Sequence, residues 1–203
     1  LGPRGQASNK IFFKLLDARI MAKSLEAVLA AANLTYPTDI DRVSLIPHPG
    51  SEGEAAREAA RQIASVSGEI RDLPIAGDDL LVSARNAERS VLRLLDSLIP
   101  VDWANIQGHA RLYSLQILSN SSFAIDGIQV EHAPVLLFDD VHELTAEQRE
   151  RLYEELVDRN VRVARWVAER KEAVEDSELL TGQTAGREYE IVLIEDALAN
   201  GQR

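Results

Sequence analysis

Two adjacent carboxylates near the end of an apolar run are the residues best suited to chemistry. The run Val135–Phe138 is continuous and apolar, which predicts a strand buried inside a sheet, and Asp139 and Asp140 follow it directly. Ligands of open α/β sheets bind at the carboxyl ends of the strands. A carboxylate in that position can hold Mg²⁺, directly or through water. Asp139 is therefore the candidate metal ligand.

The neighbouring polar residues offer candidates for acid–base work. Asp140 is placed to polarise an attacking water as a general base, and Glu143 is a second candidate for that role. His142 lies near these acids and could contact a phosphate, although a histidine in a loop is more often a surface residue. The alternative is that both aspartates simply follow a core strand and cap the next loop.

The start of the chain carries a second candidate, a phosphate-binding segment before an amphipathic helix predicted over residues 9–32. In the P-loop pattern G-x-x-x-x-G-K-[ST], backbone N–H groups and the helix N-terminus surround the phosphates. Gly2 matches the first glycine, but alanine, serine and asparagine stand where glycine, lysine and the hydroxyl residue are required. Lys10 lies two positions too far along and points about 200° away from the required direction. The candidate phosphate-binding residues are Gly2, Pro3, Arg4, Gly5, Gln6, Ala7, Ser8 and Asn9. The alternative is an ordinary Gly-Pro turn leading into a helix.

A third candidate follows the strand predicted over residues 161–168. This strand comes one helix after Val135–Phe138, so we expect the two strands to be neighbours whose ends face the same edge. Arg170 would then be positioned to sense the γ-phosphate of a nucleotide. The alternative, equally weighted, is that Arg170 is a solvated charge in a loop.

The elements that must position these residues predict an α/β fold, with a mostly parallel sheet flanked by helices and a small β-hairpin insertion. We expect one domain over residues 1–203. Capping boxes at Ser51/Glu54 and Thr145/Gln148 begin two of the helices. The predicted helices are 9–32, 51–70, 78–98 and 145–159, and the predicted strands are 42–46, 135–138, 161–168 and 189–194. The middle allows two interpretations: strands 112–118 and 123–130 joined by 119–122, or a shorter hairpin turning at Asp126-Gly127.

Composition limits the function classes. The chain has 203 residues, of which 45% are hydrophobic and 27% charged, as in ordinary globular domains. The net charge of −11 disfavours direct nucleic-acid binding, because such domains usually carry a basic surface. The apolar runs are too short to span a bilayer. With no cysteine, the chain has no disulfide or thiolate metal site, which fits a cytoplasmic protein.

These motifs together resemble a known family. The runs 136–144 and 165–170 with Gln148, and the run 186–191 with Leu193, resemble the core of P-loop ATPases of the AAA+ class, in its origin-recognition branch, and of STAND ATPases. The run 1–5 resembles the opening of the family's phosphate-binding loop (Walker A), and the run ending in Asp139-Asp140 resembles its acidic strand (Walker B). The resemblance implies binding of ATP and Mg²⁺ between the sheet edge and a neighbouring subunit or domain. It also implies a first strand before Gly2 and a helical lid after the last strand, so we expect a fragment.

Three functions compete. The first is an ATP-binding and possibly ATP-hydrolysing module of a larger protein, working with other domains or as a homo-oligomer. The second is a degenerate P-loop domain that no longer hydrolyses ATP and acts as a scaffold or regulatory interaction module. The altered residues at Ala7, Ser8 and Asn9 favour the second, and the intact pair Asp139 and Asp140 favours the first. A third is an unrelated α/β enzyme, such as a phosphotransferase, with Asp139 in its metal site.

Overall fold

The structure is a computed structural model that describes residues 3–48, 74–96, 111–132 and 134–168, with the single positions 54, 58, 102, 103, 106 and 108. The chain divides into two compact units. Unit 1 comprises Leu1–Phe138 and Arg159–Trp166, and unit 2 comprises Asp139–Asp158 and Val167–Arg203. The predicted strand 189–194, and all but two residues of the predicted helix 51–70, lie outside the described residues.

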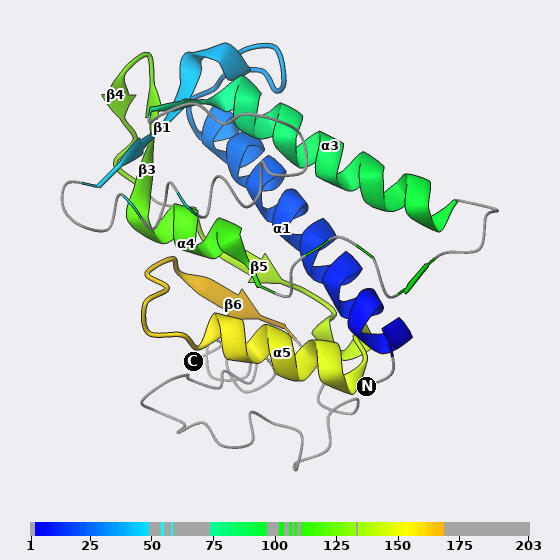
Figure 1. Cartoon of the computed structure of the whole chain (residues 1–203). Coiled ribbons are helices and arrows are strands. Elements are labelled where there is room, and N and C mark those ends of the chain that lie inside the picture. Colours follow the sequence, from blue (N-terminus) through cyan, green and yellow to red (C-terminus); the bar gives the residue numbers. More distant parts are fainter. Residues whose placement is uncertain are drawn as a thin grey trace, which may run out of the picture. The chain divides into compact units, whose positions relative to one another are not determined.

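The described elements are mixed helices and strands (Figure 1). The helices are α1 (Pro3–Ala31), α3 (Gly77–Leu95), α4 (Tyr113–Asn120) and α5 (Ala146–Leu156), with 3₁₀ turns η1 (Ile40–Arg42) and η3 (Val141–Glu143). The strands are β1 (Val43–Pro47), β2 (Ile75–Ala76), β3 (Ser121–Ile125), β4 (Ile128–Gln129), β5 (Leu136–Phe138) and β6 (Arg165–Val167).

Helix α1 supplies the largest part of the core of unit 1. Its buried residues recur at helical spacing, so that one stripe faces inward. They include Ile11, Ala18, Met21, Leu25, Val28 and Leu29. The helix ends where expected: Asn33 has φ 55°, and the N–H of Leu34 donates to the carbonyl of Leu29 at 2.9 Å. A left-handed asparagine of this kind is a common helix terminator. The predicted helix 9–32 is confirmed, although it begins at Pro3 rather than Asn9.

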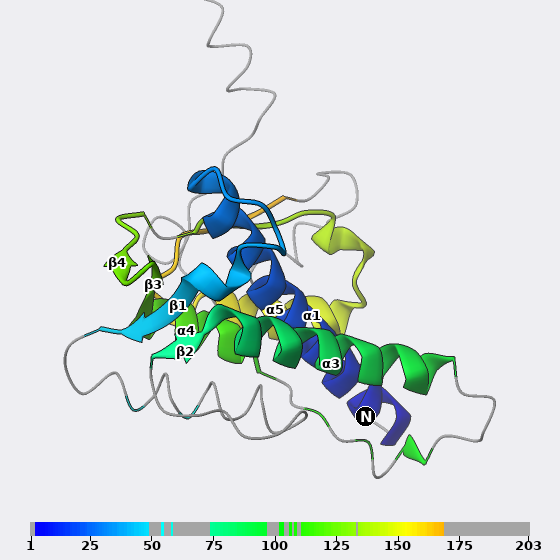
Figure 2. The same ribbon diagram turned by 90° about the horizontal axis from the view of Figure 1, so that it is seen from above.

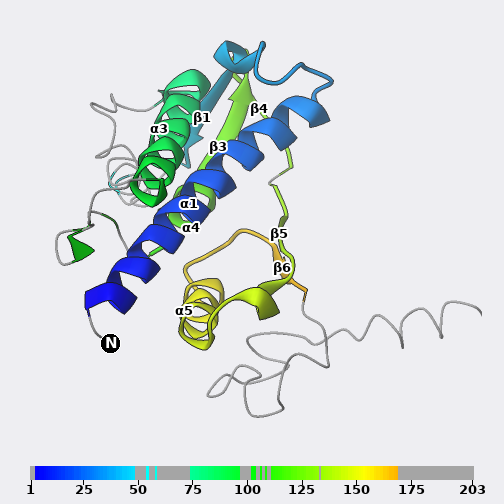
Figure 3. The ribbon, with the colours of Figure 1, turned by 90° about the vertical axis from the view of Figure 1, so that its right-hand side faces the viewer.

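Helix α3 is the main partner of α1, and the two helices run side by side (Figures 2 and 3). The inward residues of α3 are also spaced three or four apart: Leu80, Leu81, Ala84, Ala87 and Val91. The helix starts at a close approach of two backbones, because a Cβ on Gly77 would lie 2.7 Å from the carbonyl oxygen of Ile40. The predicted helix 78–98 is confirmed, with its last residue at Leu95.

The main sheet is antiparallel, which corrects the predicted fold. Its strand order is β2-β1-β3-β4, and both β1–β3 and β1–β2 pair antiparallel, with Leu45 opposite Phe123 and Ile75. A parallel pairing is found only between β5 and β6, among the described strands. The mostly parallel, P-loop-like sheet is therefore wrong for this chain. The hairpin, predicted as an insertion, is instead part of the main sheet.

The hairpin between β3 and β4 shows why the strand direction reverses. Asp126 and Gly127 have φ 51° and 80°, the left-handed pair that a two-residue hairpin turn requires. Ile125 then lies opposite Ile128. The shorter hairpin at Asp126-Gly127 is confirmed, and the strand predicted over 112–118 is wrong, because these residues begin helix α4.

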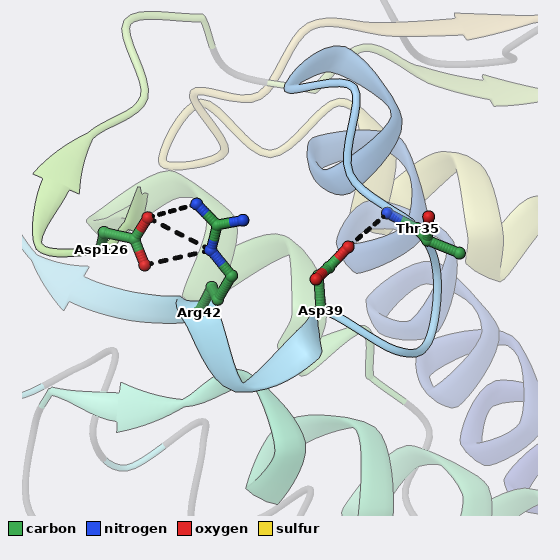
Figure 4. A network of polar contacts seen from close by, with 4 residues as sticks. All are labelled: Thr35, Asp39, Arg42 and Asp126. Atoms are coloured by element: carbon green, nitrogen blue, oxygen red, sulfur yellow. Dashed lines mark hydrogen bonds and ion pairs between the residues drawn. The ribbon is translucent and has the colours of Figure 1, made fainter.

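An ion pair ties this turn to the residue before β1 (Figure 4). The guanidinium of Arg42 donates from Nε at 3.2 Å and from Nη2 at 2.5 Å to the carboxylate of Asp126. The same contact lowers the pKa of the Asp126 carboxyl through the hydrogen bond from Arg42. Nearby, the Asp39 carboxylate accepts the Thr35 N–H at 2.7 Å and closes the turn after α1.

A buried carboxylate on α1 caps helix α4. Asp17 is 1% exposed, and its Oδ1 and Oδ2 accept the N–H groups of Ser114 at 2.7 Å and Tyr113 at 3.2 Å. These N–H groups have no partner inside their own helix, and the N-cap residue Leu112 provides no side-chain acceptor. The cap of α4 therefore comes from a residue far away in the sequence.

We expect Asp17→Asn to destabilise the protein by about 1–3 kcal/mol, because the amide NH₂ would face one of the two N–H donors and leave it unpaired in the core. Urea denaturation of the variant and the wild type measures this difference. Asp41→Asn, at an exposed site, is the matched control and should change little. Equal losses in the two variants would contradict the capping role.

A second prediction concerns Lys14, which is 6% exposed on α1 and has its pKa lowered by burial. The unfolded chain therefore binds more protons than the folded chain at pH values below the usual lysine pKa of about 10.4. The free energy of unfolding should rise with pH through that alkaline window. Lys14→Met should remove this rise and should be more stable near neutral pH.

Urea denaturation at about pH 7 and about pH 9.5 measures both effects of Lys14→Met. Lys10→Met, at a more exposed position on the same helix, is the control. If the free energy of unfolding of Lys14→Met rose with pH as steeply as that of the wild type, the burial of Lys14 would not be the cause of the rise.

Candidate functional site

The predicted strand–helix–strand segment is present in the chain. The strands β5 and β6 form where expected but are shorter, and α5 lies between them in the sequence. The N–H of Leu136 donates to the carbonyl of Ala164 at 2.9 Å. The capping box that begins α5 is confirmed by two reciprocal bonds of 3.3 Å between Thr145 and Gln148.

The candidate acids lie in a short turn directly after β5, which we call the acidic turn (residues 139–143). Asp139, Asp140 and Glu143 are exposed. The Asp139 carboxylate accepts the Asp140 N–H at 2.9 Å, and the Glu143 N–H donates to the Asp140 carbonyl at 2.9 Å. Val141, which is 3% exposed, anchors the turn from inside. The turn therefore presents three carboxylates to solvent on a hydrogen-bonded backbone.

Asp140 has an unusual backbone conformation. Its φ of 54° lies in the left-handed region, which aspartate and asparagine enter more easily than most residues. This conformation starts the 3₁₀ turn η3 and turns the chain sharply away from the end of β5. Such outliers cluster at functional sites, which makes the turn a good place for a ligand.

His142 is the residue of this turn whose role sequence reasoning missed. Its side chain is only 9% exposed, so the expectation of a surface histidine is wrong. Nδ1 lies 3.9 Å from Oδ1 of Asp140, and Nε2 lies 3.6 Å from Oε1 of Glu143. Neither contact is short enough for a hydrogen bond, and within the described part of the chain Nδ1 is buried without a partner. A histidine between Val141 and Glu143 in a short acidic segment carries no sequence signal for burial.

The acidic turn suits a metal that arrives with other ligands. Among the described residues, no cluster of three or more His, Cys, Asp or Glu side chains could hold a metal ion. Mg²⁺ does not need such a cluster, because it commonly binds one or two carboxylates together with substrate phosphates and water. Asp139, exposed at the end of β5, meets that requirement. The donor set therefore fits a phosphate-bound Mg²⁺ better than a resident structural ion.

The predicted phosphate-binding segment has a different conformation from the one expected. Residues 3–9 lie in the first turns of α1 and not in a loop. Ala7 is 2% exposed and belongs to the core, whereas Gln6 and Ser8 are exposed. Proline has no N–H, and only the first turn of a helix has N–H groups outside the i→i−4 pattern. The first turn of α1 holds no acidic residue. Gly2 and Arg170 lie outside the described residues.

An exposed apolar face on the β5–β6 pair was also missed. In a parallel pair, the bond from Leu136 to Ala164 sets Leu137 opposite Trp166, with both side chains on one face. Leu137, Trp166 and Val135 are 68%, 61% and 62% exposed. Parallel strands are normally covered on both faces, so this face is unusual.

No family model, curated protein or solved structure matches this chain. Within the described residues, no helix has both the length and the apolar character needed to cross a membrane.

Proposed function

We propose that the chain is a Mg²⁺-dependent ATP-binding module of a larger protein. The observation that carries the proposal is the position of Asp139, exposed at the end of β5 in a turn whose backbone is held by hydrogen bonds. A carboxylate there can take one position in the Mg²⁺ shell while phosphate oxygens and water take the others. The role of Asp139 is to bind the metal, and the roles of Asp140 and Glu143 are to orient water.

Two further points support a nucleotide as the ligand. Mg²⁺ commonly binds one or two carboxylates together with substrate phosphates, so a metal held by Asp139 needs an anionic co-ligand. The resemblance to AAA+ and STAND ATPases supports ATP among the nucleotides. The absence of cysteine supports a cytoplasmic site of action.

The same residues favour binding over rapid hydrolysis. In ATPases, a lysine and a hydroxyl residue at the phosphate loop stabilise the transferred phosphoryl group and the metal. Ser8 and Asn9 occupy the corresponding sequence positions in this chain, in helix α1 and not in a loop. Without the lysine charge, the transition state loses electrostatic stabilisation more than the bound nucleotide does. We therefore expect a nucleotide-responsive switch that turns over slowly.

We expect calorimetry to show ATP binding by the wild type that depends on Mg²⁺ and is weakened on the order of tenfold or more by Asp139→Asn. The asparagine keeps the size of the side chain and removes the charge that the metal needs. Removing Mg²⁺ with a chelator should weaken wild-type binding to the level of the variant.

The control is Glu150→Gln, which removes an exposed charge of the same sign from α5 and should leave binding unchanged. Thermal unfolding with and without Mg²⁺-ATP provides a second readout, because a ligand that binds the native state raises its stability. Wild-type binding that is insensitive to Mg²⁺, or no binding at millimolar ATP, would exclude the proposal.

A second candidate function, an interaction module without turnover, is favoured by the exposed apolar face on β5 and β6. Val135, Leu137 and Trp166 together place two aliphatic side chains and an indole in solvent. Tryptophan is enriched at the centres of protein interfaces, where its large surface is desolvated. The partner we propose is a second copy of the chain, because the uncovered face could then be buried against an equivalent face.

We expect sedimentation velocity to show concentration-dependent self-association of the wild type that Trp166→Ser weakens at least tenfold, since the indole would supply a large share of the buried area. The control is Ile128→Ser, which alters a 76% exposed apolar residue on the hairpin and should have no effect. A strictly monomeric wild type at all concentrations would eliminate this candidate.

A further inference from the structure

The imidazole of His142 is buried beside two exposed carboxylates of the acidic turn, those of Asp140 and Glu143. We propose that His142 is a positioning residue: its Nδ1–H donates to the carboxylate of Asp140 and fixes that carboxylate for the water-orienting role. The water-orienting role of Asp140 rests on the proposed function. The hydrogen bond between His142 and Asp140 rests only on the geometry of residues 139–143.

Burial identifies which ring nitrogen needs a partner. The side chain of His142 is 9% exposed, and Nδ1 is a buried polar atom that has no hydrogen-bond partner among the residues that the structure describes. A buried polar atom without a partner costs free energy, so native structures rarely leave one. The carboxylate oxygen Oδ1 of Asp140 lies 3.9 Å from Nδ1. A partner for Nδ1 should therefore come from Asp140.

The distance can close without moving the backbone. The Asp140 side chain is 60% exposed, so it can rotate, whereas its backbone is held by the bond from the Glu143 N–H to its carbonyl. A hydrogen bond from an imidazole N–H to a carboxylate is about 2.7–2.9 Å long. A shift of about 1 Å in the carboxylate oxygen completes it, and catalytic hydrogen bonds are often long before the ligand binds.

The tautomer of His142 determines whether Asp140 or Glu143 accepts the ring N–H. Neutral histidine carries one ring proton, so only one nitrogen can donate. If Nδ1 donates to Asp140, then Nε2 presents a lone pair to Glu143, whose side chain is 77% exposed and can turn into solvent. Asp140 has the shorter side chain and loses less rotamer freedom when it is fixed. His142 therefore holds Asp140 and leaves Glu143 mobile.

Three substitutions distinguish a His142 that positions the Asp140 carboxylate from a His142 that only fills space in the turn. His142→Asn keeps an amide donor near the position of Nδ1, His142→Gln keeps one near the position of Nε2, and His142→Phe keeps the ring without a donor. In the full chain with Mg²⁺-ATP, we expect His142→Asn to retain the ATP turnover number of the wild type. We expect His142→Gln and His142→Phe to lower it by ten- to a hundredfold, on the order found when an orienting partner is removed. The KM should change little in all three.

A readout without ATP tests the contact directly. We expect ¹⁵N NMR of the His142 ring to show the Nδ1–H tautomer in the wild type. Asp140→Gly suits the left-handed backbone and removes the acceptor, so it should shift the ring toward the Nε2–H tautomer. Thermal midpoints of all variants control for folding.

The outcomes are distinct. An Nε2–H or doubly protonated ring in the wild type near neutral pH overturns the inference, as does a His142→Asn variant no more active than His142→Phe. If the wild type binds no Mg²⁺-ATP, the proposed function fails. The tautomers of the wild type and of Asp140→Gly then decide alone whether His142 holds Asp140.

Discussion

The carboxylate of Asp17 is the interaction on which the arrangement of unit 1 depends. It is buried on α1 and accepts the two N–H groups that open α4. Helix α4 runs directly into β3, and β3 is the strand that pairs with both β1 and β4. A charged group excluded from water is tolerated only when hydrogen bonds replace its hydration, so the two backbone donors and the carboxylate require each other. The long helix and the sheet are thereby joined through one polar contact inside an apolar core.

The acidic turn accommodates its charged carboxylates in the opposite way, by leaving them in solvent. Its carboxylates remain in water, where their charge costs little, and the structure is held instead by backbone bonds and by the buried Val141. His142 is the exception, because its ring is buried while the carboxylates of Asp140 and Glu143 remain solvated. A turn built this way keeps its charged groups free to meet a cation while its backbone stays defined.

The local elements could be predicted from the sequence because their determinants are local. The apolar spacing of α1 and α3, the left-handed Asn33 and the capping box at Thr145 each act within a few residues. The direction of the strands could not be predicted, because it depends on pairings between distant segments such as Leu45 with Phe123. Helix α4 was taken for a strand because its cap lies on α1, and no local signal marks it. The site was predicted as residues that follow β5, but the burial of His142 depends on tertiary packing.

The antiparallel main sheet rules out the predicted P-loop-like sheet, but it does not rule out metal binding by the acidic turn. Function depends on the residues of a site and not on the fold alone. An exposed carboxylate such as Asp139 binds Mg²⁺ weakly alone, since water competes for the ion and screens the charge. Most of the affinity must then come from the phosphates that share the ion. Under the proposed function, a site of this kind holds metal only when the nucleotide is bound. The exposure of the acids, which would weaken a structural metal site, is consistent with that proposal.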